Sequence, residues 1–427
     1  MLHILKQQGF IRNFSVLVTG TTLAQAIPVL LQPILRRIFD ADTFALFAVY
    51  QSITSILIVI STLRYETTIV LPEKESDANH LVILSLLINL TFSLFFLIFI
   101  GIFPGLTAGW ITWPEGKQAW LYLIPPGVFF FSAAQTLNFW LIRKKAFRAS
   151  AINRVGRRVV EGAFQGTGGI FSWSGALLWG DITGRLAHFL LTIRQASSRG
   201  FTFKETGMHD IKAVALRYKD FPVFQALPAL LNTFSLMVPI LMVNSFYSAN
   251  TTAQFDLSRQ VLLLPLALIT TAMSQVLLQK FAEQRNLNQR ILPGFLKITM
   301  VSVAAAILII AFFYLAGKPL FAFLFGKQWA TAGYYSAILA PAFMIQFVVS
   351  PLSTLIIAME KVRIGAIWQF LYFLSILSLI LLRNLPETDF FKTFTLINLI
   401  LYLLYWLIML RITLQYEKSR EEKLKKS

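Results

Sequence analysis

Residues 81–100 read LVILSLLINLTFSLFFLIFI, twenty residues in a row without a charged side chain. At about 1.5 Å of helical rise per residue, a run of about 20 apolar residues matches the roughly 30 Å hydrocarbon thickness of a bilayer. Similar runs recur from one end of the 427-residue chain to the other, about twelve in all. The stretch therefore predicts a membrane-spanning helix, and its repetition predicts an all-α polytopic membrane protein.

Short connectors separate the expected spans. The spans cover 13–35, 43–63, 79–103, 118–142, 150–171, 174–194, 220–246, 253–278, 293–316, 329–357, 363–383 and 390–412. The fifth is the least apolar, because it opens with Arg154, Arg157 and Arg158 and is rich in glycine. Its interpretation as a span rests partly on the count of spans around it.

The composition excludes several classes of protein. With 56% hydrophobic and 14% charged residues, the chain lies far from the roughly 25% charged residues of soluble domains. It has no cysteine, which excludes disulfides, zinc ribbons, iron–sulfur clusters and cysteine nucleophiles. The four histidines are well separated, and neither a Walker nor a dinucleotide motif is present. We therefore expect no catalytic residue, no metal and no cofactor, with any work driven by an ion gradient such as H⁺ or Na⁺, by the membrane potential or by the substrate's own gradient.

Basic residues alternate between the two sides of the expected spans. The net charge is +18, and Lys and Arg concentrate in every second connector, such as 143–148 and 194–219, and in the tail. The positive-inside rule places these connectors and both termini in the cytoplasm. Membrane topology and anionic lipids account for the charge, so we expect membrane lipids as partners and no nucleic acid.

The chain divides into two halves. The longest connector separates six spans from six, and the motif TFALF at 43–47 recurs as TTAQF at 251–255, with Thr, Ala and Phe at the same spacing. Chance is the alternative explanation for so short a match. Two six-helix bundles related as parallel repeats are typical of transporters that rock around a central cavity. We predict two pseudo-symmetric six-helix bundles around such a cavity: an N-terminal bundle at 1–200, a cytoplasmic connector at 201–219, a C-terminal bundle at 220–413 and a basic cytoplasmic tail at 414–427.

Charged residues interrupt the runs at few places. A charge at bilayer depth costs roughly 2.5 to 3.5 kcal/mol, so it needs a partner or a wet cavity. The candidates are mostly basic: Arg36, Arg37, Arg64, Glu66, Arg154, Arg157, Arg158, Glu161, Asp181, Arg185, His188, Asp256, Arg259 and Lys297. Arginine suits diphosphate recognition, because its fork of donors binds two oxygens and stays charged at low dielectric. The positive excess favours an anionic cargo over a cationic drug.

Asp181 and Arg185 also have a simpler interpretation. They lie four residues apart on one helical face, where they would form a local ion pair that makes the helix insertable. Gly180 and Gly184 form a small-xxx-small pair on the adjoining stripe. That spacing indicates tight helix packing at this point.

Asp256 and Arg259, three residues apart, leave two alternatives open. They neutralise each other near the helix start, or they belong to a polar face that lines a central cavity. Arg36, Arg37 and Arg64 lie near span ends, where long side chains can also extend to lipid headgroups.

Several short blocks together resemble a known family. They are Gly20–Pro28 (GTTLAQAIP), Arg64–Glu66 (RYE) followed by Ile69–Pro72 (IVLP), Gly180–Arg185 (GDITGR), Arg217–Pro222 (RYKDFP), Leu230–Thr233 (LLNT), and Arg259 upstream of Pro265. In this order they resemble the polysaccharide-exporting branch of the multidrug, oligosaccharidyl-lipid and polysaccharide (MOP) exporter superfamily, and its Wzx-type O-antigen flippases in particular. The resemblance spans nearly all of the chain.

The resemblance implies a cargo and a direction. The cargo would be an undecaprenyl-diphosphate-linked oligosaccharide that a transporter, not an enzyme, flips from the cytoplasmic to the periplasmic leaflet of the bacterial inner membrane by alternating access. The product would feed O-antigen, and so lipopolysaccharide, or a related surface polysaccharide. The expected protein is a monomer that works beside other polysaccharide-assembly proteins.

The resemblance and the charges together yield candidate site residues. Contact with the diphosphate is assigned to Arg36, Arg37, Arg64 and Arg259, with Gln25 as a neutral hydrogen-bonding group. Ion coupling or charge balance is assigned to Glu66 or Asp256. The alternatives are an ion-coupled drug or small-molecule exporter of the same superfamily, which should have an acidic cavity, and a membrane polysaccharide polymerase or ligase, which should have a large periplasmic loop.

Overall fold

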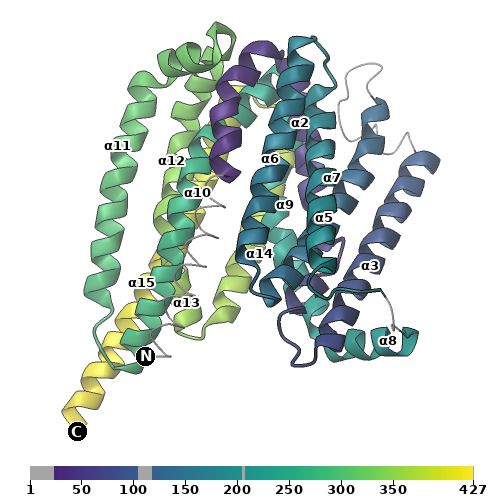
Figure 1. Ribbon diagram of the computed structural model, residues 1–427. Helices are drawn as coiled ribbons and strands as arrows, with labels where there is room; N and C mark the ends of the chain where they lie inside the picture. Colours follow the sequence, from purple (N-terminus) through teal and green to yellow (C-terminus); the bar gives the residue numbers. More distant parts are fainter. Residues whose placement is uncertain (1–23, 104–117, 204–206, 427) are drawn as a thin grey trace. The chain divides into compact units, whose positions relative to one another are not determined.

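The computed structural model describes residues 24–103, 118–203 and 207–426 (Figure 1). All secondary structure in these ranges is helical. A helix covers each expected span that lies within them, and residues 24–38 form the described part of the first. The all-α membrane fold expected from the apolar runs is confirmed.

The described residues form two compact units, and the chain passes from one to the other between Ser245 and Phe246. The expected domain boundary at 201–219 stays a prediction about topology. After the helical residues 24–38, the first unit contains α2 (Ala41–Ile60), η1 (Tyr65–Thr68), α3 (Glu75–Ile102), η2 (Gln118–Leu123), α5 (Ile124–Arg143), α6 (Phe147–Ile170), α7 (Ala176–Ser197), α8 (Met208–Arg217), η3 (Pro222–Ala226) and α9 (Leu227–Phe246).

The second unit is built from longer helices. It contains α10 (Ala249–Asn286), α11 (Leu292–Phe325), η4 (Lys327–Trp329), α12 (Ala330–Leu352), α13 (Thr354–Ala358), α14 (Val362–Leu377), η5 (Ser378–Leu382) and α15 (Glu387–Lys426). Gly317 of α11 and Gly333 of α12 let two backbones meet, since a Cβ on Gly317 would lie 2.8 Å from the Gly333 carbonyl oxygen. Phe255 and Phe391 stack at 5.1 Å between ring centroids in the same core.

Eight helical segments in the described part of the chain are long and apolar enough to cross a membrane. They are Ala41–Ile60, Glu75–Ile102, Pro222–Phe246, Ala249–Asn286, Leu292–Phe325, Lys327–Ala358, Val362–Leu382 and Glu387–Glu422. Helices α5, α6 and α7, which cover the fourth to sixth expected spans, are not among them. In α6 and α7 the reason is evident, because both carry buried charged residues along their length.

The repeated motif has the same structural role in both units. Asp40 caps the start of α2, where its carboxylate accepts a hydrogen bond from the backbone N–H of Thr43 at 2.8 Å. Ser248 caps the start of α10, where its hydroxyl accepts from the N–H of Thr251 at 3.0 Å. Such caps satisfy N–H groups that have no partner within the helix. The match between the two motifs therefore marks equivalent helix starts, as an internal repeat requires.

Candidate functional site

A network of buried charges lies in the first unit, where α2, α5, α6 and α7 pack together. Asp181 of α7 is fully buried, and Arg185, one turn later, is only 2% exposed. Arg157 and Glu161 of α6 are 9% and 7% exposed. Removing such groups from water costs several kcal/mol per ion, so each must find partners inside the protein.

Asp181 is the centre of this network. One carboxylate oxygen accepts a hydrogen bond from the Tyr50 hydroxyl at 3.0 Å and forms an ion pair with Arg185. The other accepts from Gln51 Nε2 at 3.2 Å and from Arg157 Nη2 at 3.3 Å. Residues from three helices thus meet at one carboxylate.

Arg185 is held by a second set of contacts. Its Nη1 donates to the Gly127 carbonyl oxygen of α5 at 3.1 Å, and its Nη2 donates to Gln51 Oε1 at 3.2 Å. The guanidinium carbon lies 5.4 Å from the centroid of the Phe131 ring, within range of a cation–π contact. With Nε in the ion pair with Asp181, each of the three nitrogens faces an oxygen of the protein.

Two glycines bring α6 close to α7. A Cβ on Gly184 would lie 2.8 Å from the Glu161 Cβ and 3.0 Å from the Arg157 carbonyl oxygen. A Cβ on Gly180 would lie 3.2 Å from the Glu161 carbonyl oxygen. The tight packing expected from the small-xxx-small pair is confirmed, and it places Arg157 beside Asp181.

The network has more positive than negative groups. Arg158 pairs with Glu161 at 2.9 Å, and Arg157 Nε lies 3.8 Å from the same carboxylate. Arg157, Arg158 and Arg185 thus share Glu161 and Asp181, so three positive charges minus two negative charges leaves a net charge of +1.

His188 adds an unusual polar group to this region. It is 4% exposed, and neither ring nitrogen has a hydrogen-bond partner among the described residues. It lies three residues after Arg185, which places the two side chains on neighbouring positions of α7.

Of the candidate residues near the first span, Arg36 is the one inside the protein. It is fully buried, donates from Nε to Gln32 Oε1 at 3.1 Å and lies 3.6 Å from the ring centroid of Phe44. Arg37 and Gln25 are exposed. Arg36 is therefore enclosed by protein, whereas the other two lie on the surface of their unit.

Arg64 and Glu66 are brought together just after the end of α2. Arg64 Nη1 lies 3.5 Å from Glu66 Oε1, and the Thr62 hydroxyl donates to the other oxygen of Glu66. Burial raises the pKa of the Glu66 carboxyl above its usual value of 4.5, against the smaller opposing effects of Thr62 and Arg64. Leu63 and Arg64 have positive φ angles of 50° and 64°. Such a conformation is strained for residues other than glycine and often marks a functional position.

Arg36 and Arg64 do not meet. Arg36 packs on Phe44 near the start of α2, and Arg64 follows its end. The helix has 20 residues, which corresponds to about 30 Å at 1.5 Å per residue. One diphosphate cannot contact both side chains at once.

Asp256 and Arg259 lie together in the second unit. Arg259 Nη2 is 3.7 Å from Asp256 Oδ1, and Gln260 Nε2 donates to Asp256 Oδ2 at 2.7 Å. The polar residues beside them serve helix packing: Gln254 donates to the Gln328 carbonyl at 2.8 Å, and Ser258 donates to the Ala332 carbonyl at 2.6 Å. This part of the polar stretch contacts the start of α12.

The sequence predicts a local ion pair between Asp181 and Arg185, but it does not predict their partners on other helices. The ion pair is present, but Arg157, Tyr50 and Gln51 complete it from other helices. One signal was available, because Arg157 and Glu161 repeat the same four-residue spacing on the preceding helix. Tyr50 and Gln51 carry no comparable signal.

Comparison with known proteins identifies the family. A family model described as "Polysaccharide biosynthesis protein" matches residues 34–333, well over half of the chain. The chain belongs to this polysaccharide biosynthesis protein family. Among curated proteins, no match was found.

Solved structures share the fold of this polysaccharide biosynthesis protein. The lipid II flippase MurJ in an inward closed conformation has a TM-score of 0.72 at 12% identity, covering 95% of this chain and 90% of that one. An inward-facing multidrug resistance MATE transporter of the MOP superfamily has 0.65 at 14% identity, with 96% and 99% covered. A MOP superfamily transporter from Pyrococcus furiosus has 0.63 at 12% identity, with 95% and 96% covered. The chain therefore has the fold of these structures, as the resemblance implies.

In this polysaccharide biosynthesis protein, the candidate site is a cluster of buried charged side chains. No group of three or more His, Cys, Asp or Glu residues able to hold a metal ion occurs in the described ranges. The buried charges instead form a preorganised, net-positive set of guanidinium groups, whose fork geometry and permanent charge suit phosphate oxygens.

Proposed function

We propose that this protein flips an undecaprenyl-diphosphate-linked oligosaccharide from the cytoplasmic to the periplasmic leaflet of the bacterial inner membrane, for synthesis of O-antigen or a related surface polysaccharide. The observation that carries the proposal is the net-positive network around Asp181, in a chain of the polysaccharide biosynthesis family. A diphosphate and its sugars cannot cross hydrocarbon unaided, because polar and ionised groups lose their hydration there. A preorganised cationic region offsets that loss for an anion.

The arginines at the two ends of α2 suit successive steps of alternating access. Arg64 is partly exposed, with 32% of its side chain accessible, so it serves as the first contact for the diphosphate on the cytoplasmic side. Arg36 and Arg37 act at the periplasmic end, where Arg36 must first leave its contact with Phe44. In this proposal both termini are cytoplasmic.

Arg259 and the acidic candidates complete the proposed cycle. Arg259 contacts the diphosphate from the second unit, and Gln25 offers a neutral hydrogen bond. Glu66 or Asp256 couples transport to H⁺ or Na⁺, because each carboxylate is buried beside an arginine that a phosphate can attract. The protein acts as a monomer beside other polysaccharide-assembly proteins and needs no cofactor.

Reconstitution tests the proposal directly. The purified protein is placed in liposomes with a fluorescent undecaprenyl-diphosphate oligosaccharide, and a membrane-impermeant quencher reports which leaflet holds the probe. We expect transfer well above that of protein-free liposomes, and a response to an imposed H⁺ or Na⁺ gradient. If no gradient produces transfer, the flippase function is wrong.

A second candidate is an ion-coupled drug exporter of the same superfamily. The buried Asp181 carboxylate and the shared fold with a multidrug resistance MATE transporter favour it. The two candidates differ in the charge of the cargo, since a cationic drug is repelled by the net-positive network. Gradient-driven export of ethidium from the same liposomes, without transfer of the lipid-linked oligosaccharide, would establish the exporter instead.

A further inference from the structure

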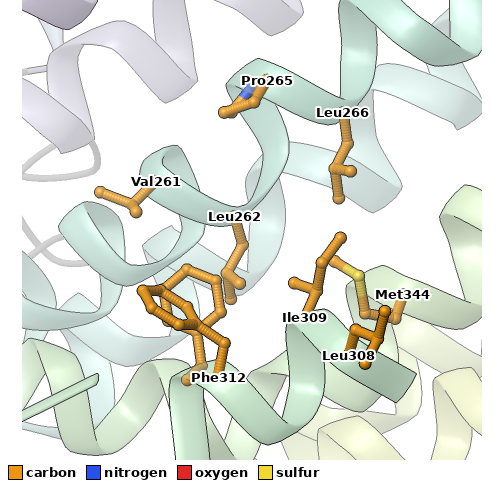
Figure 2. A pocket seen from close by; sticks show the side chains of 9 residues that line it. Val261, Leu262, Pro265, Leu266, Leu308, Ile309, Phe312 and Met344 are labelled. Carbon is orange, nitrogen blue, oxygen red and sulfur yellow. The ribbon is translucent and has the colours of Figure 1, made fainter. Parts of the chain in front are cut away.

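An apolar pocket of about 330 Å³ lies within the second unit, between α10, α11 and α12 (Figure 2). Its floor is made by Leu262 and Leu266 of α10, Phe313 of α11 and Met344 of α12, all nearly fully buried. In Figure 2, the α10 leucines point toward the side chains of α11 across the open space. All nine lining side chains are apolar, so the pocket suits a hydrocarbon chain and no polar ligand.

The pocket opens beside an exposed, apolar face of α11. Its rim residues Leu308 and Phe312 are 71% and 48% exposed. The exposed face continues along α11 through large apolar residues such as Val301 and Leu315, as expected for a helix in contact with acyl chains. A chain can therefore enter from the bilayer without crossing a polar surface.

Pro265 explains why α10 leaves space here. A proline has no N–H, so the Val261 carbonyl, four residues earlier, receives no helical hydrogen bond, and the proline ring crowds that turn. Helices depart from a regular rod at such positions. Val261 and Pro265 both line the pocket, so the pocket lies at the turn that the proline perturbs.

The pocket begins one turn from a positive charge. Arg259, Leu262 and Leu266 are spaced by three and four residues, so they share one stripe of α10. Leu262 lies only about 4.5 Å farther along the helix axis than Arg259, at 1.5 Å per residue. The positive charge of Arg259 beside the apolar pocket complements a lipid that has a phosphate at one end and an apolar chain at the other.

Asp256 does not prevent this arrangement. Arg259 Nη2 lies 3.7 Å from Asp256 Oδ1, within the range of an ion pair. Gln260 also donates to Asp256, at 2.7 Å, so the carboxylate keeps a partner when Arg259 turns to a phosphate.

We propose that this pocket holds the polyprenyl chain of the lipid carrier, at the units nearest its diphosphate, while Arg259 contacts the diphosphate. The inference rests on the proposed flippase function and adds the site of the lipid tail. At about 30 Å³ per water-sized group, the volume takes about ten carbon atoms, or about two isoprene units. The remainder of the chain stays in the bilayer, so the carrier remains anchored to the second unit.

Photolabelling of the full-length protein in liposomes tests the assignment. The probe is an undecaprenyl diphosphate with a diazirine on the isoprene unit next to the diphosphate, and labelled peptides are mapped by mass spectrometry. We expect labels on α10, α11 and α12 at the pocket residues. Unlabelled undecaprenyl diphosphate should reduce them at least tenfold, and phosphatidylglycerol should not.

A matched pair of variants adds a second readout. Leu308→Trp places a bulky ring on the rim and should lower pocket labelling at least fivefold. Leu315→Trp, seven residues later on the same exposed face of α11 and 78% exposed, does not line the pocket and should label like the wild type. The wild-type map stays decisive even if one variant does not fold.

The outcomes separate the pocket from the flippase function. Two results would contradict the assignment of the polyprenyl chain to this pocket. One is labels spread over the lipid face, and the other is competition by phosphatidylglycerol equal to that by undecaprenyl diphosphate. If leaflet transfer by the wild type persists in that case, the flippase function stands. Absence of both transfer and pocket labelling overturns both.

Discussion

Arg185 and Asp181 form an ion pair on one face of α7, yet each side chain is held mainly by residues of other helices. Asp181 accepts hydrogen bonds from Tyr50 and Gln51 of α2, and Arg185 donates to the Gly127 carbonyl of α5. The pair therefore locks α7 to its neighbours as well as neutralising itself.

Asp181→Asn should strongly destabilise the first unit. The change removes the carboxylate that pairs with Arg185 and leaves Arg157 with Glu161, and breaking a buried pair costs roughly 3–5 kcal/mol. Chemical unfolding in detergent measures the loss. Arg185→Gln and the double variant complete a mutant cycle, in which we expect a coupling of about 1–3 kcal/mol. Additive losses in the double variant would mean that the two side chains do not act together.

Gly184→Ala should destabilise the protein, while Gly166→Ala should not. The added methyl group at Gly184 would overlap Glu161 and push α6 from α7, at a cost of about 1–3 kcal/mol for an overpacked site. Gly166 of α6 has nothing within 4 Å of the new Cβ, so alanine there should be neutral or stabilise the helix by up to about 1 kcal/mol. Thermal unfolding of both variants measures this difference. Equal unfolding midpoints for the two variants would contradict the close packing of α6 against α7.

Comparison of Arg64→Gly with Arg64→Ala should separate the effect of the lost positive charge from the effect of backbone strain. Both remove the guanidinium and should lower leaflet transfer at least tenfold, if Arg64 is the first contact for the diphosphate. Glycine tolerates the positive φ of 64°, so Arg64→Gly should be more stable than Arg64→Ala by about 1 kcal/mol. Transfer rates and unfolding curves measured on the same preparations give both quantities. If either variant transfers the lipid at the wild-type rate, Arg64 does not contact the diphosphate during transfer.

Stability should fall with rising pH because of Glu66. Burial raises the pKa of its carboxyl in the folded state above the usual 4.5, so the folded protein binds the proton more tightly than the unfolded chain. Between the two pKa values the unfolded state has already lost its proton, and stability declines until the pH passes the folded value. Denaturation between about pH 4 and pH 8 should show this decline in the wild type. Glu66→Gln should be less sensitive to pH over this range, and an identical profile for the variant would assign the decline to other groups.

Features that depend on neighbouring residues of one helix were predictable from the sequence. The apolar run at 81–100 lies within α3, as expected for a run of about 20 apolar residues that matches the thickness of a bilayer. The spacing of Gly180 and Gly184 predicted close packing, since a missing Cβ lets any neighbouring helix approach. The pair Asp256 and Arg259 was also visible, because residues three apart meet on one helix.

The burial of single arginines was not predictable. Arg36 and Arg37 are adjacent and look alike in the sequence, but Arg36 is fully buried over Phe44 and Arg37 is exposed. Only the rotation of the first helix against α2 decides which of the two points inward. Likewise, the apolar pocket depends on how α10 packs around Pro265, which no pattern in one helix reveals.

The sequence by itself determined that the chain is an all-helical membrane protein of the polysaccharide biosynthesis family, because helix length, polarity and short motifs are properties of contiguous residues. The tertiary structure decided which charges share a site. Tyr50 and Asp181 are 131 residues apart and hydrogen-bond only because α2 and α7 pack side by side at a particular rotation. Contacts between helices depend on the packing of the whole unit, and so the buried cationic network becomes visible only when the helices are assembled.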